Sequence, residues 1–321
     1  IMAEMHSGAV ELAHVSAIVS IFSVSLNALL IGAIWYRSPE KLRHRVVACL
    51  FVLIDIFFSI VHVINVPIFV SIRGTFLFYP ARLIGSTSSN WLLFASFLYL
   101  CVSTMFIVCK RFFYRYAQIC SPSLYSFISN PFFLALLLLS TAIACAAITL
   151  IGMSIFLPQE SFTAGICRDF NDILVADFCD KVFLGGSVKE TLENTQAMHM
   201  LLVFLAGVAA AMIVILYCGR RIDRKVSLIK LSHFSDNLHR KTLKILIVQT
   251  VIPFVFVYLP IVIHIISMIT YVNTLPITFI LSYFLVIFPL ANAASHLYFI
   301  KDYRAFVFGI IFRPLIKVAG K

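Results

Sequence analysis

Seven long apolar segments constrain this chain more than any other feature of its sequence. A helix needs about 20 apolar residues to cross the hydrocarbon core of a bilayer, and each of these segments reaches that length. Lipid offers no hydrogen-bond partner to an open strand edge, so each segment must be helical. The sequence therefore predicts an all-α fold, a bundle of seven transmembrane helices. The predicted spans are Val15–Trp35, Val46–Val70, Ile84–Val108, Pro131–Leu157, Ala197–Tyr217, Leu243–Ile269 and Ile277–Phe299.

The charged residues predict the orientation of this bundle. Only 12% of the 321 residues are charged and 61% are hydrophobic, yet the formal net charge is +11. Nearly all of the basic excess falls after the first, third, fifth and seventh spans. The positive-inside rule places these regions in the cytoplasm and the N-terminus outside. We therefore expect a multi-pass protein of the plasma membrane with the lipid bilayer as a partner, and no nucleic-acid site in the basic stretch KRFFYRYAQI.

The soluble regions divide the chain around this membrane domain. We expect a short extracellular N-terminus at 1–14, the seven-span domain at 15–300 and a cytoplasmic amphipathic helix at 301–321. A long acidic second extracellular loop occupies 158–196, and a basic third intracellular loop occupies 219–244. Cys167 and Cys179 are the two cysteines that face the oxidising side, where they can pair or stay free. We favour a disulfide between them.

Enzyme signatures are missing from the sequence. It contains no HExxH, no GxSxG, no phosphate-binding loop and no cysteine and histidine set at zinc spacing. Asp55 is a lone intramembrane acid and not part of a carboxylate pair. We therefore predict that the protein is not an enzyme and needs no cofactor or metal.

Polar residues within spans are costly and tend to be functional. Asn27, Asp55 and Asn292 all fall about 14–15 Å from the cytoplasmic edge, counted at the rise of an α-helix. We predict that they form one polar switch cluster, with separate backbone partners as the alternative. Prolines remove a backbone hydrogen bond and bend helices. The predicted kinks are at Pro67, Pro253, Pro260 and Pro289.

A ligand cavity is expected between the outward halves of spans three, five, six and seven. One face of span six carries Tyr258, His264 and Met268 at helical spacing. Apolar walls with a few polar groups suit a small, largely apolar ligand. For any single residue, ordinary helix packing is the stronger alternative. The candidate residues are Trp91, Phe94, His199, Tyr258, His264, Met268, Thr278 and Tyr283.

Five fragments, in order, resemble the Str family of nematode serpentine chemoreceptors, which includes the diacetyl odorant receptor. They are RSPEKLRHRVVACLFVLIDIF (37–57), RFFYRYAQI (111–119), YCGRRI (217–222), LHRKTLKILIVQTVIPFVFVYLPI (238–261) and FPLANAASHLYFIKDYRAF (288–306). The resemblance implies a G-protein-coupled olfactory receptor in the membrane of a sensory neuron, placed in its sensory cilium. The chain departs from the family where Asn292-Ala293 replaces the usual Asp-Pro.

The resemblance also implies a heterotrimeric G protein as partner. Arg115 follows the end of span three, where many seven-helix receptors place Asp-Arg-Tyr, but Tyr114 stands in place of the acid. Lys110 and Arg111 are expected among the inner headgroups. The residues assigned to G-protein coupling are Arg111, Tyr114, Arg115, Tyr116, Arg220, Arg221, Lys241 and Lys244. The alternatives are a seven-span odorant-gated channel, which the charge bias opposes, and a membrane transporter.

Overall fold

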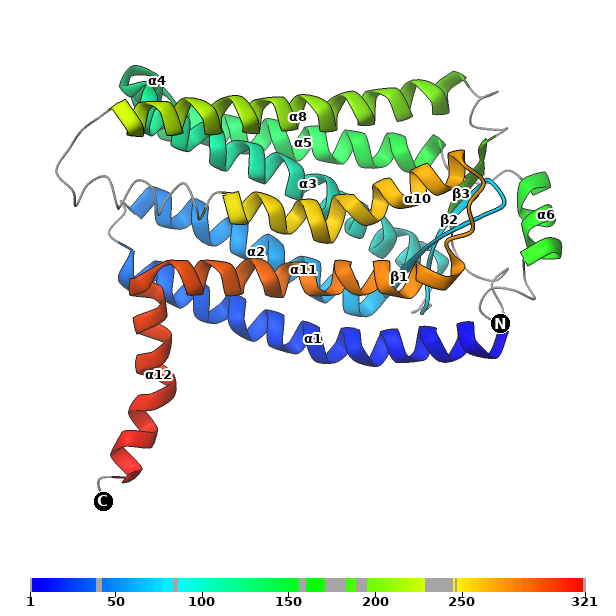
Figure 1. Ribbon diagram of the computed structural model, residues 1–321, viewed down its shortest axis with the longest axis horizontal. Helices are drawn as coiled ribbons and strands as arrows, with labels where there is room; N and C mark the ends of the chain where they lie inside the picture. Colours follow the sequence, from blue (N-terminus) through cyan, green and yellow to red (C-terminus); the bar gives the residue numbers. More distant parts are fainter. Residues whose placement is uncertain are drawn as a thin grey trace.

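The computed structural model is a bundle of long helices with a small sheet at one end (Figure 1). It describes residues 2–38, 42–82, 86–155, 160–170, 183–188, 195–228, 245 and 247–319. The first half of these comprises α1 (Met2–Arg37), α2 (Leu42–Asn65), β1 (Pro67–Ile72), β2 (Thr75–Pro80), α3 (Thr87–Cys120), α4 (Pro122–Ile128) and α5 (Pro131–Ile155). The second half comprises α6 (Glu160–Phe170), β3 (Leu184–Ser187), α8 (Thr195–Leu228), the π-helix η2 (Phe254–Tyr258), α10 (Leu259–Ile269), the 3₁₀ turn η3 (Leu275–Ile277), α11 (Thr278–Phe299) and α12 (Lys301–Ala319).

The predicted all-α bundle is confirmed. Within the described residues, six helical stretches are long and apolar enough to cross a membrane: Ser7–Arg37, Arg45–Asn65, Ser88–Cys120, Pro131–Ser154, Ile247–Ile269 and Leu275–Phe299. The remaining predicted span, Ala197–Tyr217, lies in α8, which runs beside α3 and α5 in Figure 1. The 34 residues of α8 correspond to about 51 Å of helix, which exceeds the hydrocarbon thickness of a bilayer.

The packing of α1 is that of a membrane helix. Ser16, Ser20, Ser23 and Asn27 recur every three or four residues and are all buried, while Phe22 on the opposite side is 63% exposed. Small and weakly polar residues let helices approach closely in a membrane, and the apolar face meets lipid. This stripe turns α1 toward α2 and α11, its two main neighbours.

A three-stranded antiparallel sheet, in the order β1-β2-β3, caps one end of the bundle (Figure 1). It corrects the prediction that span two continues to Val70 and that Pro67 kinks it. Helix α2 ends at Asn65, Val66 has a φ of 45°, and Pro67 is the first residue of β1. Proline is tolerated at the start of a strand, where no ladder donor is needed.

The turn between β1 and β2 follows ordinary hairpin chemistry. Ile72 pairs with Thr75, so Arg73 and Gly74 form a two-residue loop, and both have positive φ (49° and 77°). Such loops match the twist of the flanking strands. Strand β3, which lies between α6 and α8 in the chain, pairs Gly185 and Gly186 with β2. All six residues of β1 are buried, so the strand lacks the alternation of a surface strand.

The two ends of the chain are also helical. Residues 2–14, predicted as an extracellular tail, belong to α1, and Leu12 is fully buried. At the other end, α12 leaves the bundle at an angle (Figure 1), and its Tyr303 is buried beside α1 and α11. Cys167, on α6, is disulfide-bonded. Cys179 lies outside the described residues, so the pairing of these two cysteines stays a prediction.

Candidate functional site

Aromatic side chains of the sheet fill the end of the bundle that the sheet caps, where the ligand cavity was predicted. The rings of Phe69 and Phe78 stack with centroids 3.8 Å apart, and the Phe78 ring lies 4.2 Å from Phe94 on α3. Phe97 of α3 and Phe58 of α2 extend the cluster, with centroids 5.4 Å apart. All five rings are buried. Aromatic rings at these distances are in direct packing contact.

Polar contacts also hold the sheet to the adjacent ends of spans six and seven. The Ser71 backbone N–H donates to the Thr274 hydroxyl at 2.7 Å, and that hydroxyl donates to the Ser71 carbonyl at 3.2 Å. His264 lies beneath, with its ring 5.8 Å from that of Phe69 and Nδ1 3.4 Å from the Thr274 hydroxyl. The hydroxyl of Thr278 donates to the Thr274 carbonyl at 2.9 Å.

In the part of the chain that the structure describes, most of the predicted ligand residues therefore pack around the sheet. Trp91 packs edge-on against Phe94, and Tyr283 packs against the core cluster that contains β1 and β2 residues. Met268 is buried on α10. His199 is not brought to the others: it is exposed, and its Nδ1 bonds the Thr195 carbonyl of its own helix at 2.7 Å. Tyr258, the remaining candidate, lies deeper in the bundle.

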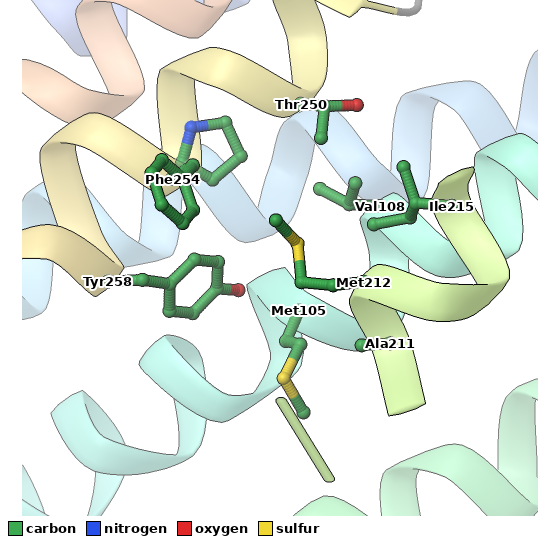
Figure 2. Close-up of a pocket in the computed structure, with 9 residues that line it drawn as sticks. Met105, Val108, Ala211, Met212, Ile215, Thr250, Phe254 and Tyr258 are labelled. Carbon is green, nitrogen blue, oxygen red and sulfur yellow. The ribbon is translucent and has the colours of Figure 1, made fainter. Parts of the chain in front are cut away.

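A pocket does exist around Tyr258, between α3, α8 and the π-helix η2. Its cavity volume is about 20 Å³. In Figure 2 the Tyr258 hydroxyl points toward the two methionines, Met105 and Met212. Sequence reasoning included Tyr258 but missed the other walls. The lining residues are Met105, Val108, Ala211, Met212, Ile215, Thr250, Pro253, Phe254 and Tyr258.

The π-helix gives this pocket one of its walls. Pro253 precedes η2 and Pro260 follows it in α10, so two backbone donors are missing within eight residues. The Leu259 N–H bonds the carbonyl of Phe254, five residues back. Such π-bulges are rare in proteins, and those that occur are often found at functional sites. Tyr258 is the last residue of η2, and its hydroxyl lies 2.9 Å from the hydroxyl of Thr104 on α3.

The predicted polar cluster of Asn27, Asp55 and Asn292 does not form a single hydrogen-bonded triad. Asn292 on α11 donates from Nδ2 to the Asp55 carboxylate on α2. Asn27 instead donates to the Ser23 carbonyl at 2.9 Å and to the Pro289 carbonyl of α11 at 3.3 Å. The hydroxyls of Ser23 and Ser59, 2.8 Å apart, link α1 to α2. Pro289 lies inside α11, and its carbonyl accepts a hydrogen bond from Asn27 of α1.

Arg111 turns into the bundle, which corrects the prediction that it is an inner-leaflet anchor. Its guanidinium lies 5.3 Å from the ring centroid of Phe51 on α2. It is close enough to Asp55 and to His296 on α11 to interact electrostatically with both. His296 in turn lies 3.1 Å from Nε2 of Gln249 in the segment that leads into η2. Sequence reasoning missed both the Gln249–His296 contact and the direction of Arg111.

The other predicted coupling residues that the structure describes lie toward the C-terminal ends of α3 and α8. Arg115 donates to the Gln118 side chain at 2.7 Å, and the hydroxyls of Tyr114 and Tyr125 lie 3.3 Å apart. The ring of Tyr116 lies 6.0 Å from that of Tyr217 on α8. Arg221 stacks over the ring of Tyr217 on α8. Arg220, the preceding residue, belongs to the same helix. Lys241 and Lys244 lie outside the described residues.

Comparison with known protein families decides among the classes of membrane protein that the sequence left open. A family model described as serpentine type 7TM GPCR chemoreceptor Str matches residues 12–308. The chain belongs to this family. The Str receptor is a seven-transmembrane, G-protein-coupled chemosensory receptor, as the resemblance implied, and its family is not a family of enzymes. No curated protein matches the chain.

Proposed function

We propose that this Str receptor binds a small, largely apolar ligand arriving from outside the cell and activates a heterotrimeric G protein in the cytoplasm. The observation that carries the proposal is the chain of polar contacts between helices. Thr104–Tyr258, Asp55–Asn292 and Gln249–His296 connect spans two, three, six and seven between the pocket and the cytoplasmic ends. A ligand that shifts one of these helices changes the contacts of the others.

The N-terminus is proposed to be extracellular and the C-terminus cytoplasmic, in the plasma membrane of a sensory cilium. The basic excess of alternate loops supports this orientation. Epitope tags at the two ends test it in intact cells. We expect antibody to reach the N-terminal tag before permeabilisation and the C-terminal tag only afterwards. The reverse pattern would fit the odorant-gated channel and contradict the receptor orientation.

Arg115 is proposed to contact the G protein. Replacing it by alanine should abolish ligand-dependent signalling and leave surface expression unchanged, since Arg115 bonds Gln118, which lies one turn away on the same helix. The measurement is the cyclic nucleotide and calcium response of cells to a panel of small uncharged volatiles. Arg82→Ala, an exposed cation at the extracellular end, is the matched control. Full signalling by Arg115→Ala would remove Arg115 from the coupling surface.

The same cells test the function as a whole. Deleting the cellular G-protein α subunits should eliminate the response to every active volatile. A response that persists without G proteins would contradict coupling and favour a channel.

A further inference from the structure

We propose that the exposed face of α8 near its C-terminal end binds a phospholipid whose headgroup carries phosphomonoester groups, a phosphorylated inositol lipid of the cytoplasmic leaflet. A hollow of about 390 Å³ lies on this face. The inference rests on the proposed orientation of the chain only in the choice of leaflet, and it requires no G protein. The residues that line the hollow are Ile213, Leu216, Tyr217, Arg220, Arg221 and Arg224.

The hollow lies on the side of α8 that turns away from the other helices. Its lining residues recur every three or four positions, which places them on one face of the helix. The opposite face packs on α3, where Ile215 and Cys218 are buried in one cluster with Phe112. Helix α8 itself runs along the edge of the bundle (Figure 1). Within the part of the chain that the structure describes, the face with the hollow is therefore open to lipid.

The two halves of the hollow match the two halves of a phospholipid. Ile213 is 67% exposed and Leu216 is 56% exposed, so the first half offers apolar side chains to acyl chains. The second half consists of the three arginines, which follow Tyr217 along the helix. From Arg220 to Arg224 the helix rises about 6 Å, similar to the depth of one headgroup layer. All three guanidinium groups can therefore reach the phosphates of one lipid layer.

The positive charge of this face is left for a ligand. Among the described residues, no carboxylate pairs with the three arginines, and Asp223 does not line the hollow. Arg221 instead donates from Nε to the Tyr217 hydroxyl at 3.3 Å, and its guanidinium lies 5.5 Å from the centre of that ring. These contacts leave the four N–H groups of its terminal nitrogens for another acceptor. Arginine binds phosphate through two parallel N–H donors, so an anionic phosphate group is the complementary ligand.

Three arginines also distinguish among the anionic lipids. Phosphatidylserine has a single net negative charge, which cannot satisfy three guanidinium groups. A phosphomonoester carries about 1.5 to 2 negative charges at pH 7. An inositol lipid with two phosphomonoesters and its phosphodiester presents three phosphate groups to the three arginines. Basic clusters directly beyond a transmembrane helix are typical of sites for such lipids. Arg220 and Arg221, which the sequence assigned to G-protein coupling, thus gain a lipid partner.

Native mass spectrometry of the full-length receptor in mild detergent tests this site. The first two probes are dioctanoyl phosphatidylinositol 4,5-bisphosphate and dioctanoyl phosphatidylserine. The third is inositol 1,4,5-trisphosphate, which has a phosphorylated ring but no acyl chains. Each probe is titrated separately, and the fraction of receptor that carries one bound molecule gives the dissociation constant.

We expect the bisphosphate lipid to bind saturably, and about tenfold or more tightly than phosphatidylserine. Arg224→Gln should weaken its binding about fivefold, and the triple change of Arg220, Arg221 and Arg224 to Gln about a hundredfold. The matched control Lys225→Gln removes the same charge one residue further along α8, outside the hollow, and should stay within about twofold of the wild type. The trisphosphate should bind at least about tenfold more weakly than the lipid, because it has no alkyl groups for the apolar half.

Three results would overturn the inference. Equal affinity for the two lipids would reduce the arginines to general membrane anchors. Equal losses from Arg224→Gln and Lys225→Gln would mean that overall charge attracts the lipid and the hollow does not. Equal affinity for the trisphosphate and the lipid would remove the apolar half from the site. Unfolding midpoints check that the variants fold, and the preference of the wild type between the two lipids depends on no variant.

The experiment also separates this inference from the proposed function. Selective binding of the bisphosphate lipid without any cellular response to volatiles would leave the lipid site intact and contradict coupling. A G-protein-dependent response, with no preference for the bisphosphate lipid, would leave the receptor function intact and contradict the lipid site. A reversed pattern of the epitope tags would contradict the choice of the cytoplasmic leaflet.

Discussion

Replacing Phe78 by alanine should lower the free energy of unfolding by about 3–5 kcal/mol, as for other buried phenylalanines. Phe78 is 1% exposed, and its ring lies 3.8 Å from Phe69, 4.2 Å from Phe94 and 5.7 Å from Phe97. These partner rings belong to β1 and α3, and the two elements cannot both shift to fill the cavity that the missing ring would leave. The measurement is the thermal unfolding midpoint of the purified receptor in detergent.

Phe57→Ala is the matched control for this loss. Phe57 lies on α2 and is 57% exposed, so removing its ring deletes contact with lipid and creates no cavity. Its unfolding midpoint should stay within a few degrees of the wild type. Equal losses from Phe78→Ala and Phe57→Ala would mean that the sheet does not stabilise the bundle.

The sheet and the aromatic rings packed against it could not be predicted from the sequence, because hydropathy does not distinguish a buried strand from a helix. The apolar run that forms α2 continues through Val70, so the predicted span continued with it. A turn signal was nonetheless present: Arg73-Gly74 is a two-residue polar break between runs rich in aromatic and β-branched residues. The third strand could not be found this way, because Gly185-Gly186 indicates a loop break unless its partner β2 is known.

The depth of polar residues could be predicted far better than their partners. Counting residues from the basic loops placed Asp55 and Asn292 at one level, and the two side chains are hydrogen-bonded. The same count placed Asn27 beside them, yet its amide bonds the Pro289 carbonyl. Rise per residue fixes depth, whereas the choice among neighbours at one depth depends on how each helix is rotated.

Helix rotation also explains the error at Arg111. Charge and position place this residue near the inner headgroups, but α3 continues as one helix from Thr87 to Cys120. Arg111 and Arg115 are four residues apart and so lie about 40° apart around the axis. The Arg111 side chain reaches Phe51 and the region of Asp55, whereas Arg115 bonds Gln118 toward the end of the helix. Only the packed structure distinguishes these two directions.

Removing the charge of Asp55 or of Arg111 should lower the free energy of unfolding by about 1–3 kcal/mol, because the two groups attract each other electrostatically inside the bundle. Asp55→Asn keeps an amide oxygen that can accept from Asn292, and Arg111→Met keeps an apolar stem against Phe51. Both changes therefore test charge more than shape. We also expect Asp55→Asn to change ligand-independent signalling, since Asp55 lies where α2, α3 and α11 meet.

The double variant Asp55→Asn with Arg111→Met carries the decisive comparison. It removes both charges, so its loss should be smaller than the sum of the single losses by about 1 kcal/mol or more. Unfolding midpoints and ligand-independent cyclic nucleotide levels are measured for the four proteins of the cycle. Lys110→Met is the matched control, because Lys110 precedes Arg111 on α3 but donates to the Leu137 carbonyl of α5 at 3.1 Å. Strict additivity, or an equal rescue of Asp55→Asn by Lys110→Met, would mean that Arg111 and Asp55 are not coupled across the bundle.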